Sequence, residues 1–80
     1  MDAHATVLYF AALRDAAGVA SERVDARGTL GEVYDGLRER HGFRWTRPQL
    51  RVAVDGAFAR WEDEVQSGSE VAFIPPVSGG

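Results

Sequence analysis

Residues 29–43 read TLGEVYDGLRERHGF, and they contain the clearest structural signal in the chain. Thr29 and Glu32 match a capping box, in which each side chain accepts a hydrogen bond from the backbone N–H of the other residue. Apolar residues then recur at helical spacing, at Leu30, Val33, Tyr34 and Leu37, and His41 extends the same stripe. Gly42 suits the left-handed conformation that ends many helices. The pattern predicts one amphipathic helix over residues 30–41.

Short β-prone segments lie on both sides of this helix. We expect strands at residues 6–10, 19–25, 50–54, 57–61 and 70–74, and a short helix at 11–17 that ends at Gly18. The first strand has apolar residues on both faces, which is typical of a strand buried on both sides. One long helix can cover one face of a mixed sheet of four or five strands. The order of the elements therefore predicts an α+β fold of the β-grasp kind.

Composition excludes several classes of function. The 80 residues suffice for one domain with a thin core. The chain has no cysteine, which excludes a disulfide framework, a thiolate metal site and a cysteine nucleophile. Its nine basic residues are all arginines spread along a chain of net charge −3, which argues against nucleic-acid binding. No apolar run reaches membrane-spanning length and no signal pattern is present, so we expect a cytoplasmic protein.

The last eleven residues, EVAFIPPVSGG, hold the group most suited to chemistry. Pro75 and Pro76 cannot donate to a sheet ladder, so they end the last strand. We expect a domain over residues 1–76 and a flexible tail over 77–80. Without a Cβ, Gly79 and Gly80 can enter a narrow channel, and the terminal carboxylate is open to adenylation followed by attack of a sulfur nucleophile. The alternative is a frayed terminus without function.

Other polar groups give weaker signals. His4 and His41 are too few for a metal site, and His41 is expected to meet the last carbonyls of its helix. Residues 62–64, EDE, are interpreted as a solvated turn and not as a general acid or base. No phosphate-binding loop or serine nucleophile motif is present.

Ile74 is more informative because strand side chains alternate between faces. If Val71 and Phe73 face the core, Ile74 faces outward beside Pro75, with Phe10 near it. We expect an apolar docking surface at the root of the tail. The alternative is a sheet that its own loops cover on both faces.

Two stretches carry a family resemblance: VLYFAALR at residues 7–14 and GSEVAFIPPVSGG at residues 68–80. They resemble the small, sulfur-carrier subunits of molybdopterin synthase, of the MoaD/ThiS family, which are ubiquitin-like β-grasp proteins. The likeness covers essentially the whole chain. The Gly-Gly ending alone is shared with ubiquitin-like modifiers and the thiamine sulfur carrier, whereas the Pro-Pro-Val-Ser-Gly-Gly ending and the Phe-Ala-x-Leu-Arg stretch point to the molybdopterin branch.

The resemblance implies that an E1-like adenylyltransferase uses ATP to adenylate Gly80, which a sulfur donor enzyme then converts to a thiocarboxylate. The thiocarboxylate would give sulfur to cyclic pyranopterin monophosphate inside the large synthase subunit, which would supply most catalytic groups in a heterotetramer. No cofactor would stay bound to this chain. Gly79 is expected to act with Gly80 at the reacting terminus. The residues expected to bind partners are Phe10, Arg14, Ile74, Pro75, Pro76, Val77 and Ser78.

Three other functions stay open. The chain could carry sulfur for another pathway, such as thiamine, cysteine or tRNA thiolation. It could be a ubiquitin-like modifier that is joined to lysines of target proteins. It could also be a β-grasp interaction module with an inert tail.

Overall fold

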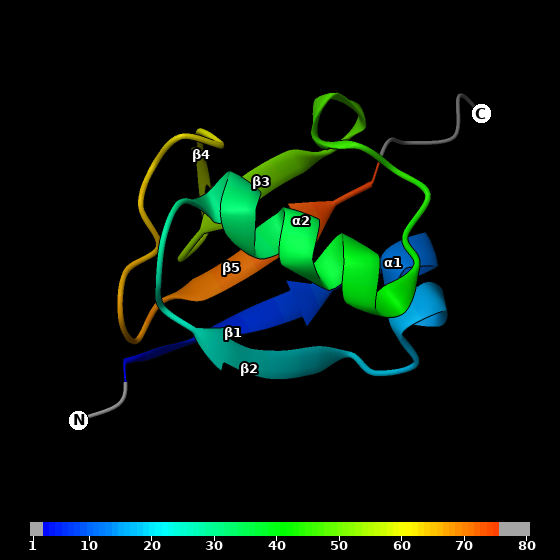
Figure 1. Cartoon of the computed structure of the whole chain (residues 1–80), viewed down its shortest axis with the longest axis horizontal. Coiled ribbons are helices and arrows are strands. Elements are labelled where there is room, and N and C mark those ends of the chain that lie inside the picture. The colour runs from blue at the N-terminus through cyan, green and yellow to red at the C-terminus, as the bar shows by residue number, and fades with distance from the viewer. Residues whose placement is uncertain (1–2, 76–80) are drawn as a thin grey trace.

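The computed structural model describes residues 3–75, and within them one helix lies across a twisted five-stranded sheet (Figure 1). The described elements, in chain order, are β1 (His4–Tyr9), α1 (Ala11–Ala17), β2 (Ser21–Asp25), α2 (Leu30–His41), a 3-10 turn η1 (Arg47–Gln49), β3 (Arg51–Val54), β4 (Ala57–Ala59) and β5 (Glu70–Ile74).

The strands lie in the order β2-β1-β5-β3-β4. β1 and β5 run parallel at the centre, and every other neighbouring pair is antiparallel. The register places Tyr9 beside Phe73. Because parallel strands end at the same edge of a sheet, the residues that follow β1 and β5 emerge together. This mixed sheet with one crossing helix is the predicted β-grasp arrangement.

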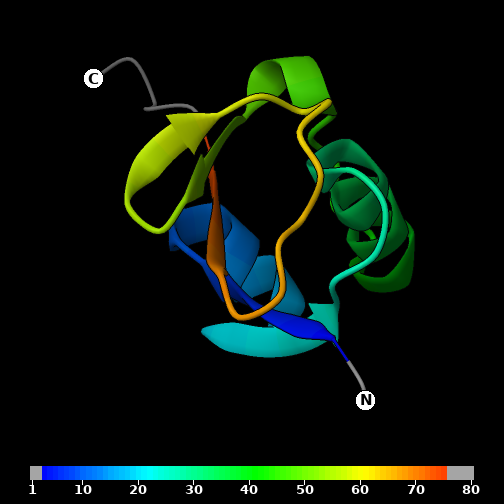
Figure 2. The same cartoon turned by 90° about the vertical axis from the view of Figure 1, so that its left-hand side faces the viewer.

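Helix α2 forms as its sequence predicts. The side chain of Thr29 accepts from the N–H of Glu32 at 3.1 Å, and the carboxylate of Glu32 accepts from the N–H of Thr29 at 2.8 Å. Gly42 ends the helix with φ 72°, in the left-handed region. Seen from the side, α2 covers one face of the sheet only (Figure 2).

The core fills the space between α2 and the sheet. Tyr34 packs from α2 against Phe73 of β5, with ring centroids 5.0 Å apart, and Trp61 stacks on the same Phe73 ring. The Tyr34 hydroxyl donates to the carbonyl of Trp45 at 2.6 Å, which holds the irregular connection after α2. Other fully buried side chains are Val7, Tyr9, Leu13, Leu30 and Val71.

Some predicted boundaries and one predicted environment are wrong. β1 is not buried on both sides: Ala5, Val7 and Tyr9 are buried under α2, whereas Thr6 and Leu8 face the uncovered side. Apolar residues on both faces of β1 suggested burial on both sides, but Leu8 belongs to an apolar surface that α2 does not cover. Phe10 lies outside β1, as the residue that caps α1. β2 begins only at Ser21, and β4 ends at Ala59, since Trp61 turns inward to pack on Phe73.

Candidate docking face and tail root

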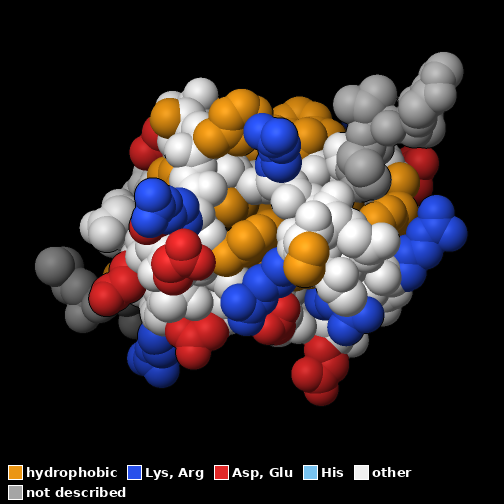
Figure 3. Space-filling model, turned by 90° about the horizontal axis from the view of Figure 1, so that it is seen from above, with side chains coloured by type: hydrophobic (Ala, Val, Ile, Leu, Met, Phe, Trp, Pro, Cys, Tyr) orange, Lys and Arg blue, Asp and Glu red, His pale blue; other side chains and the backbone are white. Residues whose placement is uncertain are grey.

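The outer face of the sheet, opposite α2, carries an apolar hollow of about 340 Å³. We call this surface the docking face; its apolar side chains are Leu8, Phe10, Ala53, Phe58, Ala72 and Ile74, and Gly56 and the charged Glu70 also line it. Phe10 is 48% exposed and Phe58 is 67% exposed. Viewed from above, hydrophobic side chains gather on the side away from α2, whereas charged side chains predominate on the α2 side (Figure 3). Exposed apolar patches of this kind are candidates for interaction sites.

Side-chain size explains why this face is hollowed. Ala72 of β5 lies between Leu8 of β1 and Ala53 of β3 in the sheet register. The two alanines form a low floor at the middle of the sheet, while Phe10, Phe58 and Ile74 stand at its rim. Side chains alternate between the two faces of β5, and Val71 and Phe73 are fully buried on the α2 side, so Ala72 and Ile74 face outward.

The β3–β4 turn places Phe58. Asp55 and Gly56 both have positive φ, at 50° and 86°, as a two-residue hairpin turn requires. The backbone N–H of Asp55 donates to the carbonyl of Glu70 at 2.8 Å, and the Asp55 side chain accepts from the N–H of Glu70 at 2.8 Å. These two bonds fix the hairpin to β5, so Phe58 is held at the rim of the hollow, beside its cross-strand neighbour Ala53.

A sharp bend after β1 places Phe10. Ala11 has φ 50°, which a residue with a side chain adopts rarely. The carbonyl of Phe10 accepts from the N–H of Leu13 at 3.1 Å, and Leu13 is fully buried. The bend therefore sends the chain into α1 while the Phe10 ring stays on the outer face.

The tail root lies beside this face. Ile74 is the last residue of β5, opposite Arg51 of β3, and both Ile74 and Pro75 are half-buried. Pro76, Val77, Ser78, Gly79 and Gly80 lie outside the described residues. The roles predicted for them, and the division at residue 76, stay predictions.

Arg14 lies elsewhere. It is exposed on α1, where it lines a separate polar hollow with Asp15 and Ala20. The structure brings Phe10 and Ile74 together and leaves Arg14 apart from them. Sequence reasoning missed Leu8, Ala53, Phe58 and Ala72; alternation against the buried Val71 and Phe73, together with the Asp55–Gly56 turn, was the signal that could have found them.

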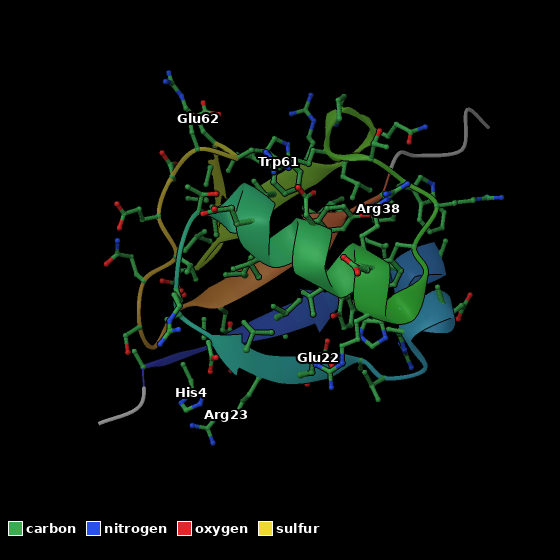
Figure 4. The ribbon with its side chains drawn as sticks, viewed as in Figure 1. His4, Glu22, Arg23, Arg38, Trp61 and Glu62 are labelled. Atoms are coloured by element: carbon green, nitrogen blue, oxygen red, sulfur yellow. The ribbon has the colours of Figure 1, made fainter. Side chains whose placement is uncertain are left out.

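A partly buried polar cluster joins α2 to the sheet on the opposite face. The Glu22 carboxylate accepts from the Tyr9 hydroxyl at 2.6 Å and contacts Nε2 of His41 at 2.8 Å. Figure 4 labels Glu22 on β2. Burial, reinforced by the bond to Glu22, raises the pKa of Tyr9. Burial of Glu22 acts to raise its pKa, but the hydrogen bonds from Tyr9 and His41 outweigh it and hold that pKa below its usual value. His41 thus meets a carboxylate and not, as predicted, the helix carbonyls.

The acidic segment forms a turn. The side chain of Asp63 accepts from the N–H of Arg60 at 3.0 Å, and Glu62 points outward from this turn (Figure 4). Among residues 3–75, no three His, Cys, Asp or Glu side chains converge as metal ligands would. None of the helices in that range has the length and apolarity needed to span a bilayer.

These observations define the class of this protein. It is a ubiquitin-like β-grasp protein with an apolar outer face beside the end of its last strand. The chain belongs to the ThiS family, whose match covers residues 7–80. It is 35% identical over 79 residues to the molybdopterin synthase sulfur carrier subunit of Haemophilus influenzae. The aligned region covers 92% of this chain and 96% of that protein.

Solved structures share the fold. The small archaeal modifier protein 1 of H. volcanii superposes with a TM-score of 0.78 at 29% identity, over 94% of this chain and 99% of that one. A chain in the complex of subunits 1 and 2 of the molybdopterin-converting factor from Helicobacter pylori superposes with a TM-score of 0.68 at 18% identity, over 96% of this chain and 99% of that one.

Proposed function

We propose that this chain is the sulfur-carrying small subunit of a molybdopterin synthase, with Gly80 as the carrier residue. The observation that carries the proposal is that the docking face reaches, at Phe10 and Ile74, the edge where β1 and β5 end and from which the sequence continues to Gly79 and Gly80. The name of the Haemophilus influenzae relative supports the same role.

The chemistry needs no catalytic side chain from this chain. A carboxylate is a poor electrophile, so an E1-like enzyme first joins it to the AMP moiety of ATP and releases pyrophosphate. A sulfur nucleophile supplied by a donor enzyme then displaces AMP and leaves a thiocarboxylate at Gly80. The thiocarboxylate gives its sulfur to cyclic pyranopterin monophosphate, and two loaded carriers serve each product because the product takes up two sulfur atoms.

The folded part of the chain would then bind the partner subunit and orient the C-terminal tail toward it. We propose that Phe10, Phe58 and Ile74 insert against the large synthase subunit, which supplies the substrate-binding and proton-transfer groups. The complex of two subunits described for the Helicobacter pylori protein supports a partner of this kind. Because activation consumes ATP, we place the reaction in the cytoplasm.

Intact-mass spectrometry tests the sulfur-carrier chemistry. The chain, produced with an activating enzyme and a sulfur source, is expected to gain the mass of one sulfur in place of one oxygen. Deleting Gly79 and Gly80 is expected to leave thermal unfolding unchanged and to abolish that mass shift and molybdopterin formation. A truncated protein that still supported molybdopterin formation would contradict the proposal.

Pull-down with the large synthase subunit separates this pathway from other sulfur-carrier pathways. We expect the chain to retain the large subunit and not a thiazole-forming enzyme. The opposite result, together with an intact mass shift, would assign the chain to another thiolation pathway.

A second candidate is a protein modifier, which the likeness to small archaeal modifier protein 1 favours. The chain contains no lysine, so isopeptide adducts would form on lysines of other proteins and not as chains of this one. Proteomic detection of target lysines that carry the C-terminal segment of this chain would support the modifier role, and its absence would count against it. Because Arg60 is the last basic residue, trypsin would leave residues 61–80 as the remnant on the lysine.

A further inference from the structure

The docking face has a positive group at the end nearest the tail root and a negative group at its far end. Arg51 begins β3 directly opposite Ile74, so the two residues share the outer face. The Arg51 guanidinium lies over the Phe58 ring, 5.3 Å from its centroid. Glu70 lines the hollow where β5 begins. The apolar hollow therefore lies between two opposite charges.

These two charges are too far apart to neutralise each other. Arg51 lies beside Ile74, and Glu70 comes four residues before Ile74, so about 13 Å of strand separates the two positions. The Debye length at physiological ionic strength is about 8 Å. Within residues 3–75, neither the Arg51 guanidinium nor the Glu70 carboxylate takes part in an ion pair or a hydrogen bond. Both charged groups are therefore available to a partner.

Other charges around this face leave the pattern in place. The Asp55 side chain accepts from the N–H of Glu70 and so adds a second carboxylate at the far end. Arg23 of β2 is separated from Glu70 by Thr6 of β1 in the register, and it extends beyond the edge of the sheet (Figure 4). The charged turn at residues 60–64 lines no part of the hollow. The far end of the hollow is therefore bordered by carboxylates.

We propose that Arg51 and Glu70 fix the direction in which the large synthase subunit lies on the docking face. This inference rests on the proposed function and adds the charge pattern of the partner, which places a carboxylate opposite Arg51 and a cationic side chain opposite Glu70. An apolar hollow with an alanine floor would by itself accept a partner in either direction along β5. Complementary charges at its two ends favour one direction and oppose the other. The favoured direction brings the tail-receiving part of the partner to Ile74.

The contact between Arg51 and Phe58 suits this role. A guanidinium that stacks on an aromatic ring is held in place, and the N–H groups at its edge stay free to donate to a carboxylate. The charged group and the most exposed apolar side chain of the docking face therefore meet the partner as one unit.

An exchange of the two charges tests the direction. Arg51→Glu combined with Glu70→Arg reverses the pattern and keeps the net charge of the chain at −3. Association of the full chain with the large synthase subunit is measured by stopped-flow fluorescence at several salt concentrations. We expect the exchange variant to associate at least about tenfold more slowly than the unaltered chain at low salt, and this difference to shrink as salt is raised.

Single substitutions separate charge from packing. Arg51→Gln is expected to weaken binding about threefold, the loss of one exposed charge pair, whereas Arg51→Lys keeps the charge and most of the association rate. The matched control is Arg27→Gln, which removes the same charge between β2 and α2, away from the docking face, and should bind like the unaltered chain. Circular dichroism checks that every variant is folded.

Three results would overturn the proposal. Equal association rates of the unaltered chain and the exchange variant would refute the charge pattern and leave the proposed function standing. Dimerisation of the chain alone that Arg51→Glu abolishes and the exchange variant retains would make a second copy the occupant, because the exchanged charges still complement each other across a two-fold axis. No binding of the unaltered chain to the large subunit would refute the proposed function as well.

Discussion

Replacing Phe58 by alanine tests the docking face most directly. Phe58 is 67% exposed, so of a phenylalanine surface of about 200 Å² about 130 Å² is free to be buried by a partner. At about 25 cal/mol for each Å², full burial stabilises the complex by about 3 kcal/mol. Alanine keeps about a third of that contact, so the loss is about 2 kcal/mol, or a dissociation constant about 30-fold higher.

The same substitution should hardly affect the fold. The Phe58 ring contacts the guanidinium of Arg51 at 5.3 Å, and an exposed cation–π contact contributes less than about 1 kcal/mol. We expect Phe58→Ala to fold with a thermal midpoint close to that of the unaltered chain. Loss of partner affinity would then report on the interface and not on unfolding.

Isothermal titration calorimetry with the large synthase subunit measures the effect. Val19→Ala is the matched control, because Val19 is also an exposed apolar residue, at 44%, but lies outside the docking face. We expect Val19→Ala to bind like the unaltered chain. If Phe58→Ala remains folded and binds the large subunit within twofold of the unaltered chain, the docking face is wrongly assigned.

Three further predictions concern the fold that supports this face. Thr29→Ala removes the capping-box acceptor of α2 and should lower the free energy of unfolding, measured by urea titration, by about 1 kcal/mol. Thr29→Ser should restore that stability. Equal stability of the unaltered chain and both variants would contradict the capping role. Glu22→Gln tests how stability depends on pH. The pKa of Glu22 is lower in the folded chain than in the unfolded chain, where it is about 4.3, so ionised Glu22 stabilises the fold above that pH. This stabilisation is lost as the pH falls through the lower pKa of the folded chain. The difference in urea midpoint between the unaltered chain and Glu22→Gln should therefore narrow as pH is lowered from neutral through that range, and a constant difference would refute it. Gly36→Ala adds a Cβ in open space within α2 and should raise stability by about 0.5–1 kcal/mol, measured by thermal unfolding; a decrease would mean that the helix is not open there.

The elements of the fold with local causes were predictable. The bounds of α2 were right to the residue, because the capping box of Thr29 and Glu32 and the left-handed Gly42 each act within a few residues of the chain. The short α1 and strand β5 were equally accessible, since Gly18 and Pro75 mark where they stop. The start of β2 and the end of β4 were not, because residues 18–20 form a bend before β2 and Trp61 turns inward to pack on Phe73.

The candidate site, too, was predictable only where its residues are set by local patterns in the sequence. Phe10 and Ile74 were predicted to lie near each other from strand alternation, and they do. Phe58 and Ala72 were missed, because a hollow arises from the relative size of side chains on three neighbouring strands. The pairing of His41 with Glu22 was missed for a similar reason: the two residues are 19 positions apart and meet only when α2 crosses β2.

By itself the sequence determined where α2 begins and ends, which faces of β5 point inward and outward, and that Gly-Gly follows a strand ended by prolines. These features depend on backbone preferences and on the two-residue period of a strand, which act over short separations. Only the tertiary structure decided that β1 has one uncovered face and that Ala53 and Ala72 form a low floor beside Phe58. It also decided that β2 lies at an edge of the sheet. Strand order and register set those neighbours, and both are fixed by packing between segments that are far apart in the chain.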